Sequence, residues 1–276
     1  MFRNTRIGFV GIGQMGQGIL KGLVASGQVA ADNLYVTDID ARRLKQIEEC
    51  GVHTILTDGA NSGAKELAKL TDVLVIAVKP QLASHILNSL AGEVRPNQLI
   101  VSIMGGIPID FIEKALPENP VLRVMPNTPV MVRKGVSGIV LGNKVDERLR
   151  ELGVGLFDLL GGTYLLDESL IDPLTGLCGC SPAFAYMFID ALAMGGVERG
   201  LPAEDSIRMA AQAMAGAAEM VLSTGRHPGE LAANVCTPAG STIAGVHALE
   251  EKAFKGVVMG ALCKACDRML DVGKKV

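Results

Sequence analysis

A glycine-rich segment near the N-terminus has the residue types and spacing that hold phosphate groups. It comprises Gly11, Ile12, Gly13, Gln14, Met15 and Gly16. In a Gly-x-Gly-x-x-Gly pattern, the first glycine permits a tight turn and the second lets the backbone approach a pyrophosphate. The third allows a helix to pack closely on a strand. Backbone N–H groups and the helix dipole would then bind the phosphates. The segment predicts a dinucleotide site; the alternative is a purely structural turn.

A carboxylate follows at the position where a ribose-binding acid belongs. Asp38 ends the second apolar run, roughly 20 residues beyond the glycine pattern. An acid here repels a 2′-phosphate and favours NAD, whereas Thr37, Arg42 and Arg43 could accommodate NADP. Alternatively, Asp38 or Asp40 caps the helix that begins at residue 41. The sequence leaves both the role of Asp38 and the cofactor preference open.

Three further segments carry polar or small residues where apolar runs end. They are Ala77, Val78, Lys79 and Pro80 after the run 73–78, the small residues 102–106, and Asn127 between two prolines. In open α/β sheets, ligands bind at the carboxyl edge, where such strand ends meet. Lys79 could instead be an ordinary solvated lysine. Asn127 either faces a nicotinamide or only helps the chain to cross over to the next strand.

The segment 235–243 in the C-terminal half has the composition of an anion-binding helix start. Pro238 separates two helical patterns, and Gly240, Ser241 and Thr242 supply exposed amides and hydroxyls. Such a start binds carboxylates well. The alternative is ordinary N-capping by serine or threonine.

No other cluster suggests chemistry. The four histidines have no recognisable acid partner, and we expect His227 to serve helix entry beside Pro228. Cys263 and Cys266 lack a second Cys/His pair with zinc spacing, so we expect no metal and interpret them as two partly buried thiols one helical turn apart.

Periodicity indicates the elements that position these residues. Up to about residue 167, short apolar strands alternate with helices, which predicts a parallel sheet covered on both faces. Beyond it, helical patterns dominate, including a nearly all-apolar stretch at 209–222, expected to be buried on most faces, and a single helix at 248–272. We therefore expect an α/β Rossmann-type doubly wound domain (residues 1–167) followed by an all-α domain (residues 168–276), for which the resemblance described below implies a role in dimerisation.

Composition excludes several classes of protein. The 276 residues are 49% hydrophobic and 20% charged, so intrinsic disorder is excluded. A net charge of −3 leaves no electrostatic footprint for nucleic acid. No uninterrupted apolar run of about 18 residues predicts a membrane span. We expect a cytoplasmic protein with reduced thiols that binds neither nucleic acid nor membrane.

Taken together, these segments resemble the pyrroline-5-carboxylate reductase family. The resemblance rests on GIGQMG at 11–16, AVKPQ at 77–81, RVMPNTP at 123–129, LTGLCGCSPAF at 174–184, HPGEL at 227–231 and NVCTPAGSTIAG at 234–245. It implies reduction of the cyclic imine 1-pyrroline-5-carboxylate to L-proline by NADPH or NADH. It also implies a homodimer formed by interlocking helical domains, with dimers often building a larger ring such as a decamer.

The resemblance also assigns residues. Cofactor contacts fall on Gly11 to Gly16, Thr37, Asn61, Lys79, Pro80, Gly105 and Asn234. The substrate site falls on Thr237, Gly240, Ser241 and Thr242, presented by the partner subunit, and the hydroxyl of Thr242 would donate to the imine nitrogen. Such a reduction needs proximity and fixed dipoles rather than a nucleophile or a metal.

The chain departs from the family pattern at a few small residues. Cys180 and Ser181 stand where the family usually has Ser and Gly, Cys236 where it has Ser or Thr, and Ala239 where it has Gly. Two rival interpretations remain. One is a related imine or β-hydroxyacid dehydrogenase, although no lysine lies between Lys144 and Lys252 to act as the general acid of hydroxy-acid chemistry. The other is a non-catalytic nucleotide-binding regulator.

Overall fold

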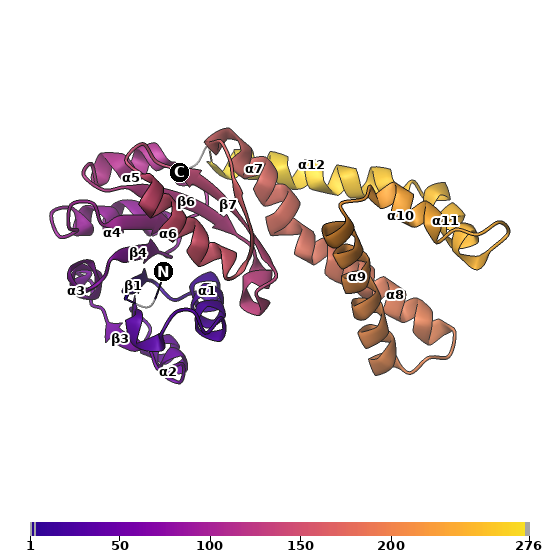
Figure 1. The fold of residues 1–276 in the computed structure, drawn as a ribbon, viewed down its shortest axis with the longest axis horizontal. Coiled ribbons are helices and arrows are strands. Elements are labelled where there is room, and N and C mark those ends of the chain that lie inside the picture. Colours follow the sequence, from indigo (N-terminus) through magenta and orange to yellow (C-terminus); the bar gives the residue numbers. More distant parts are fainter. Residues whose placement is uncertain (1, 3, 274–276) are drawn as a thin grey trace. The chain divides into compact units, whose positions relative to one another are not determined.

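The computed structural model describes residue 2 and residues 4–273, with side chains through residue 269. The chain divides into two compact units. Unit 1 comprises Met1–Gly179 and the chain from Cys266 onward, and unit 2 comprises Cys180–Ala265. Figure 1 shows the sheet of unit 1 and the helices of unit 2. This division falls after Gly179 and not at residue 167. The domain boundary that the sequence predicts at residue 167 therefore stays a prediction.

Unit 1 is built on one mostly parallel sheet. Its strands are β1 Ile7–Val10, β2 Leu34–Asp38, β3 His53–Leu56, β4 Val73–Ile76, β5 Leu99–Ser102, β6 Val121–Pro126, β7 Gly135–Leu141 and β8 Gly161–Leu165. They are ordered β3-β2-β1-β4-β5-β6-β7-β8, and the strands from β1 to β6 pair in parallel. The order 3-2-1-4-5-6 is that of a doubly wound dinucleotide-binding fold, which confirms the predicted fold class.

Helices cover both faces of this sheet. They are α1 Gln14–Ala25, α2 Ala41–Glu48, α3 Ser62–Leu70, α4 Ala83–Leu90, α5 Ile109–Ala115, α6 Glu147–Asp158 and α7 Ile171–Leu174. One core cluster joins alternate strand residues such as Phe9 and Val75 to α1, α2 and α6. The other joins the intervening residues, such as Leu74 and Ile76, to α3, α4 and α5. Side chains alternate across a strand, so each short apolar run feeds two cores.

The predicted parallel sheet has one antiparallel pair, because β7 runs antiparallel to β6. Only residues 127–134, which include the short 3-10 segment Thr128–Val132, join these two strands. A parallel partner would need a crossover of a dozen or more residues. β8 then returns parallel to β7 after the crossover helix α6. The sequence prediction also missed β3, α3, α6 and β8.

Unit 2 is helical. Its helices are α8 Ser181–Glu198, α9 Ala203–Thr224, α10 Pro228–Asn234, α11 Ser241–Glu251 and the start of α12 Phe254–Gly273. α8 packs along α9, and the ring of Phe188 lies 5.7 Å from that of Phe254, centroid to centroid. The predicted single helix 248–272 is wrong, because the chain breaks between α11 and α12, where Ala253 has φ 53°.

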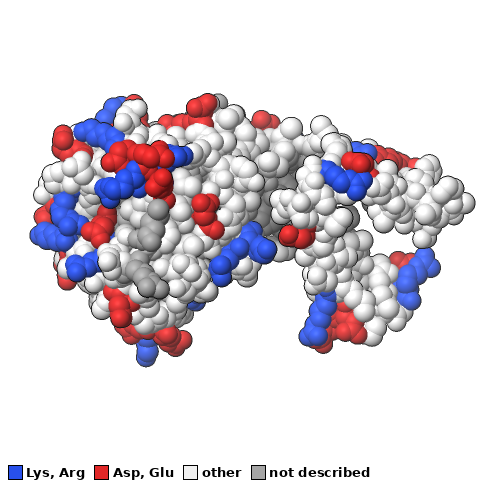
Figure 2. Space-filling model, viewed as in Figure 1, with Lys and Arg blue, Asp and Glu red and all other residues white. Residues whose placement is uncertain are grey.

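Few side chains of unit 2 are buried in the single chain. Among residues 180–265 only Ala193, Ser206 and Ala210 are buried. The expectation that 209–222 is buried on most faces is therefore wrong for one chain: Leu222, for example, is 74% exposed. On the face of the molecule drawn in Figure 2, charged side chains interrupt the surface of unit 2 at only a few places. Apolar surface of this extent indicates an interaction face.

One helical stretch, residues 168–198, is long and apolar enough to pass as a candidate membrane span. The apolar runs of the sequence did not predict a span here, because charged residues such as Asp172 and Asp190 interrupt the apolar residues. A single such helix is weak evidence for a membrane, and its exposed apolar side chains are equally what a helical dimer interface needs.

Candidate functional site

The glycine pattern of unit 1 forms the turn between β1 and α1. Gly11 has φ +91°, and a Cβ there would lie 2.9 Å from the carbonyl oxygen of Ala77. A Cβ on Gly16 would lie 3.1 Å from the carbonyl oxygen of Gly11. A Cβ on Gly13, by contrast, would meet nothing within 4 Å. The fold thus leaves no room for a side chain at Gly11 and little at Gly16, whereas Gly13 opens on free space that a pyrophosphate can approach.

The N-terminus of α1 adds donors to this open space. Gly13 is its N-cap and provides no side-chain acceptor, and no acid stands in the first turn. The first N–H groups of a helix lack intrahelical partners, so those of α1 are available to a phosphate. The residues present therefore fit a dinucleotide.

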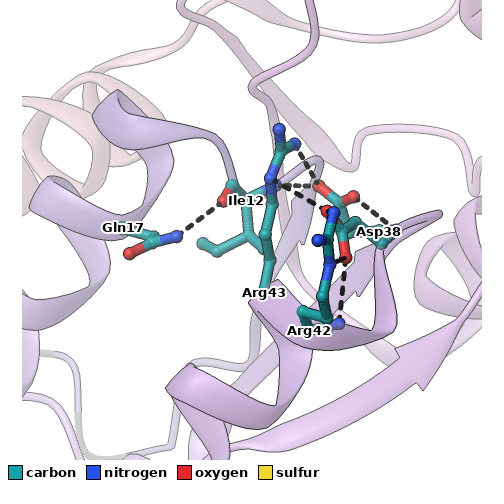
Figure 3. Close-up of polar contacts among 6 residues, drawn as sticks. Ile12, Gln17, Asp38, Arg42 and Arg43 are labelled. Carbon is teal, nitrogen blue, oxygen red and sulfur yellow. Dashed lines mark hydrogen bonds and ion pairs between the residues drawn. The ribbon is translucent and has the colours of Figure 1, made fainter.

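Asp38 fastens this turn to the end of β2. Its Oδ2 accepts a hydrogen bond from the Ile12 N–H at 2.8 Å, and its Oδ1 accepts one from the Asp40 N–H at 2.9 Å. Gln17 holds the other side of Ile12 by donating to its carbonyl oxygen at 3.2 Å. Figure 3 shows Asp38 beside Arg43, one terminal nitrogen of which lies 3.7 Å from Asp38 Oδ2. Asp40, not Asp38, caps α2, because its carboxylate accepts from the Arg42 N–H. The capping alternative for Asp38 is therefore wrong.

Two more predicted cofactor residues, one in β2 and one directly before α3, each donate a side-chain hydrogen bond within the protein. Thr37 is buried and donates from its hydroxyl to the carbonyl oxygen of Ile55 at 2.8 Å. Asn61, with φ 57°, precedes α3, and its amide donates to Ser89 Oγ at 3.2 Å. A Cβ on Gly63 would lie 2.2 Å from Thr37 Oγ1, so α3 can begin this close to β2 only with glycine.

The ends of β4 and β5 bring further predicted residues to the same sheet edge. Ala77 extends the pairing with β1 through its N–H to the Val10 carbonyl oxygen at 2.9 Å, and Val78 follows it. Lys79 is exposed, and Pro80 opens a 3-10 turn. Gly105 follows β5, the neighbour of β4. Because β1, β4 and β5 are adjacent, their strand ends share one edge, as expected.

Asn127 is buried at the end of β6, and its side-chain amide makes hydrogen bonds to the backbone of the protein. It donates to the carbonyl oxygen of Cys178 at 2.9 Å and accepts from the Val136 N–H at 2.7 Å. It thereby joins β6 to β7 and to the π-helical segment Thr175–Cys180. Burial raises the pKa of the Cys178 thiol. These contacts support a crossover role for Asn127; one amide N–H stays available to a ligand.

In unit 2 the predicted substrate residues form the loop into α11. Gly240 donates from its N–H to the Thr237 carbonyl oxygen at 2.9 Å, and a Cβ on Gly240 would lie 2.3 Å from Thr237 Oγ1. Ala239 holds the left-handed conformation at φ 55°. Ser241 and Thr242 begin α11 and are exposed, and no hydrogen bond of their hydroxyls is found within the described residues.

The start of α11 is thus open to an anion. Its N-cap, Gly240, has no side chain to satisfy the first N–H groups. Unpaired N–H groups and two hydroxyls at a helix N-terminus can bind a carboxylate and donate to a neighbouring polar atom. The predicted cofactor residue Asn234 ends α10, on the other side of the loop.

Two minor sequence interpretations can be compared with the structure. His227 caps α10 by accepting from the Gly229 N–H at 3.0 Å, which confirms its role in helix entry. Cys263 is exposed and Cys266 half-buried, so only the second fits the expected partly buried thiol. Within the described residues, no group of three or more His, Cys, Asp or Glu side chains could hold a metal ion.

Comparison with known proteins gives matches over the whole chain. The model for pyrroline-5-carboxylate reductase dimerisation matches residues 168–271, and the model for NADP oxidoreductase, coenzyme F420-dependent, matches residues 6–106. The pyrroline-5-carboxylate reductase of Methanosarcina acetivorans is 37% identical over 99% of both chains. That of Escherichia coli K12 is 35% identical over 98% of both.

Solved structures agree. The pyrroline carboxylate reductase of Plasmodium falciparum, solved with NADP bound, matches with a TM-score of 0.86 at 30% identity and covers 99% of this chain and 100% of its own. A pyrroline-5-carboxylate reductase from Coxiella burnetii matches with a TM-score of 0.87 at 28% identity over 98% of both chains.

Proposed function

The chain belongs to the pyrroline-5-carboxylate reductase family, and we propose on this premise that it reduces 1-pyrroline-5-carboxylate to L-proline with NAD(P)H, the last step of proline synthesis. The observation that carries the proposal is likeness to named reductases over nearly the full chain, not over the dinucleotide-binding half alone. A Rossmann half by itself would fit many oxidoreductases.

We assign cofactor binding to the carboxyl edge of the sheet in unit 1. The open side of Gly13 and the N-terminus of α1 hold the pyrophosphate, and Lys79, Pro80 and Gly105 line the path from β4 to β5. Bound NAD(P)H supplies the hydride. Asn127 holds β6, β7 and the π-helical segment in fixed positions around this edge through its two amide contacts.

The start of α11 is assigned to the substrate. The N–H groups of Ser241 and Thr242 bind the carboxylate, and the Thr242 hydroxyl donates to the imine nitrogen. When the imine carbon gains a hydride, the electron pair of its C=N bond moves to nitrogen. The nitrogen takes up two protons from water in all, so proline leaves as a protonated secondary amine. An imine is already electrophilic, so the protein need only hold the two reacting carbons together and fix dipoles around them.

The helical half forms a dimer, in keeping with its match to the dimerisation model. The exposed apolar side chains of unit 2, such as Met187 at 73% exposure, supply the surface to be covered. We further propose that the α11 start of one protomer serves the cofactor of its partner, that dimers assemble into a larger ring such as a decamer, and that the enzyme is cytoplasmic.

The decisive experiment is an assay of the purified protein for NAD(P)H oxidation by 1-pyrroline-5-carboxylate, with proline as the product identified. The same preparation is offered β-hydroxy acids with oxidised cofactor as the matched control. Turnover of the imine alone supports the proposal. Turnover of a hydroxy acid alone indicates the related dehydrogenase, and nucleotide binding without any turnover indicates a regulator; either result refutes the proposal.

A further inference from the structure

The charged cluster at the end of β2 lies where the adenosine ribose of a bound dinucleotide belongs. It comprises Asp38, Asp40, Arg42 and Arg43, and its two acids and two bases carry no net charge. NADH and NADPH differ only at this ribose, by a hydroxyl against a phosphate. The cluster therefore decides which cofactor the proposed reductase prefers, and the inference below rests on that function.

Asp38 is the fixed member of the cluster. Its side chain is only 6% exposed, and each of its oxygens accepts one backbone N–H, from Ile12 and from Asp40. An ionised carboxylate can accept about four hydrogen bonds. Two positions therefore remain, which suits the two hydroxyls of a ribose. Asp38 cannot turn away from a ligand without releasing the glycine turn at Ile12.

The arginines are already engaged with these acids. Arg42 holds Asp40 with two contacts, Nε to Oδ1 at 3.2 Å and one terminal nitrogen to Oδ2 at 3.1 Å. Arg43 lies 3.7 Å from Asp38 Oδ2 and 3.8 Å from Asp40 Oδ2. The hydrogen bonds from Arg42 hold the pKa of Asp40 below its usual range, so this acid stays charged.

A 2′-phosphate would therefore meet two carboxylates and two neutralised bases. Arg42 is 90% exposed and such surface pairs are weak, so it can move. Asp38 cannot move away, because its carboxylate is held by the Ile12 N–H, and its negative charge would face the phosphate at close range. We propose that Asp38 makes this chain prefer NADH over NADPH, accepting from the adenosine ribose hydroxyls and repelling a 2′-phosphate.

The test uses probes that lack the nicotinamide, so that binding is measured without turnover. Titration calorimetry gives Kd for ADP-ribose and for 2′-phospho-ADP-ribose on the full chain. We expect the unphosphorylated probe to bind at least ~10-fold more tightly, the order of a like-charge repulsion near a protein surface. Equal affinities, or tighter binding of the phosphorylated probe, overturn the proposal without any variant.

Asp38→Asn then isolates the charge, because asparagine keeps the shape and one acceptor oxygen. The preference should fall to about one or reverse, as Arg43 becomes available to phosphate. Asp110→Asn is the matched control: it makes the same charge change at a 78% exposed position of α5. An unchanged preference in folded Asp38→Asn, checked by circular dichroism, overturns the proposal. If Asp38→Asn does not fold, the ratio of the two Kd values measured on the wild-type protein decides whether the proposal stands.

The outcome is distinguishable from that of the proposed function. A protein that selects ADP-ribose but does not reduce the imine keeps this inference and loses the function. A protein that reduces the imine equally well with NADH and NADPH, and binds both probes equally, keeps the function and loses this inference.

Discussion

Replacing Gly13 by alanine should separate cofactor binding from folding. The new methyl group points into open space, since a Cβ at Gly13 meets nothing within 4 Å, and the backbone at φ −67° and ψ −173° suits any residue. Replacing the glycine N-cap by alanine costs about 0.5–1 kcal/mol, and the reduced freedom of the unfolded chain, worth about 0.4–1 kcal/mol, offsets this cost. We therefore expect the free energy of unfolding to change by less than about 0.5 kcal/mol.

Cofactor affinity should fall instead. The methyl group would stand where a phosphate approaches the loop and would break at least one N–H bond to a charged oxygen. Such a bond contributes about 1.5–3 kcal/mol, which corresponds to a rise of roughly 10- to 100-fold in Kd. The chain has no tryptophan, so NADH fluorescence can be titrated without indole emission. Urea unfolding followed by circular dichroism measures the stability.

Gly11→Ala is the matched control. There the backbone has φ +91° and the added Cβ would lie 2.9 Å from the Ala77 carbonyl oxygen. We expect a loss of about 2 kcal/mol of stability, mostly from left-handed backbone strain. An unchanged Kd for NADH in Gly13→Ala would refute the dinucleotide interpretation of the open side, and a stability loss equal to that of Gly11→Ala would refute the packing argument.

Four other experiments have definite expected outcomes. Thr242→Ala should lower kcat by ~10- to 10³-fold, the range for one preorganised donor, while Thr242→Ser keeps most activity; equal rates would place the donor elsewhere. Mixed dimers of Gly13→Ala and Thr242→Ala chains should regain activity only if a site combines two protomers. Ala239→Gly should raise the unfolding free energy by up to about 1 kcal/mol, because relieved strain at φ 55° exceeds the entropy lost to glycine, as urea titration would show. At pH 8, Cys178 should alkylate more slowly than a free thiol such as glutathione, as mass spectrometry would show, since its raised pKa leaves less thiolate.

Sequence patterns predict the central strands and the glycine turn well, because strong local signals fix them. β1 and β4 are unbroken apolar runs buried on both faces, and such runs are typical of strands in parallel sheets. The edge strand β3 escaped prediction because His53, Thr54 and its other residues are only half-buried or exposed. The direction of β7 also escaped, since periodicity carries no information about strand orientation.

Other features depend on contacts that no local pattern encodes. The break between α11 and α12 falls at Ala253, an excellent helix former, rather than at a glycine or proline. The role of Asp38 depends on the N–H of Ile12, which is distant in sequence. Both carboxylates near α2 looked equally able to cap it, and only their positions in space separate Asp40 from Asp38.

The scarcity of buried side chains in unit 2 has a consequence for how the chain becomes stable. A compact unit whose only buried residues between 180 and 265 are two alanines and one serine cannot offset its own conformational entropy. Its core must come from two chains, so this half folds in a bimolecular step whose rate depends on protein concentration. The unfolding temperature should then rise with protein concentration, and dilution alone should loosen the helices while the sheet stays intact.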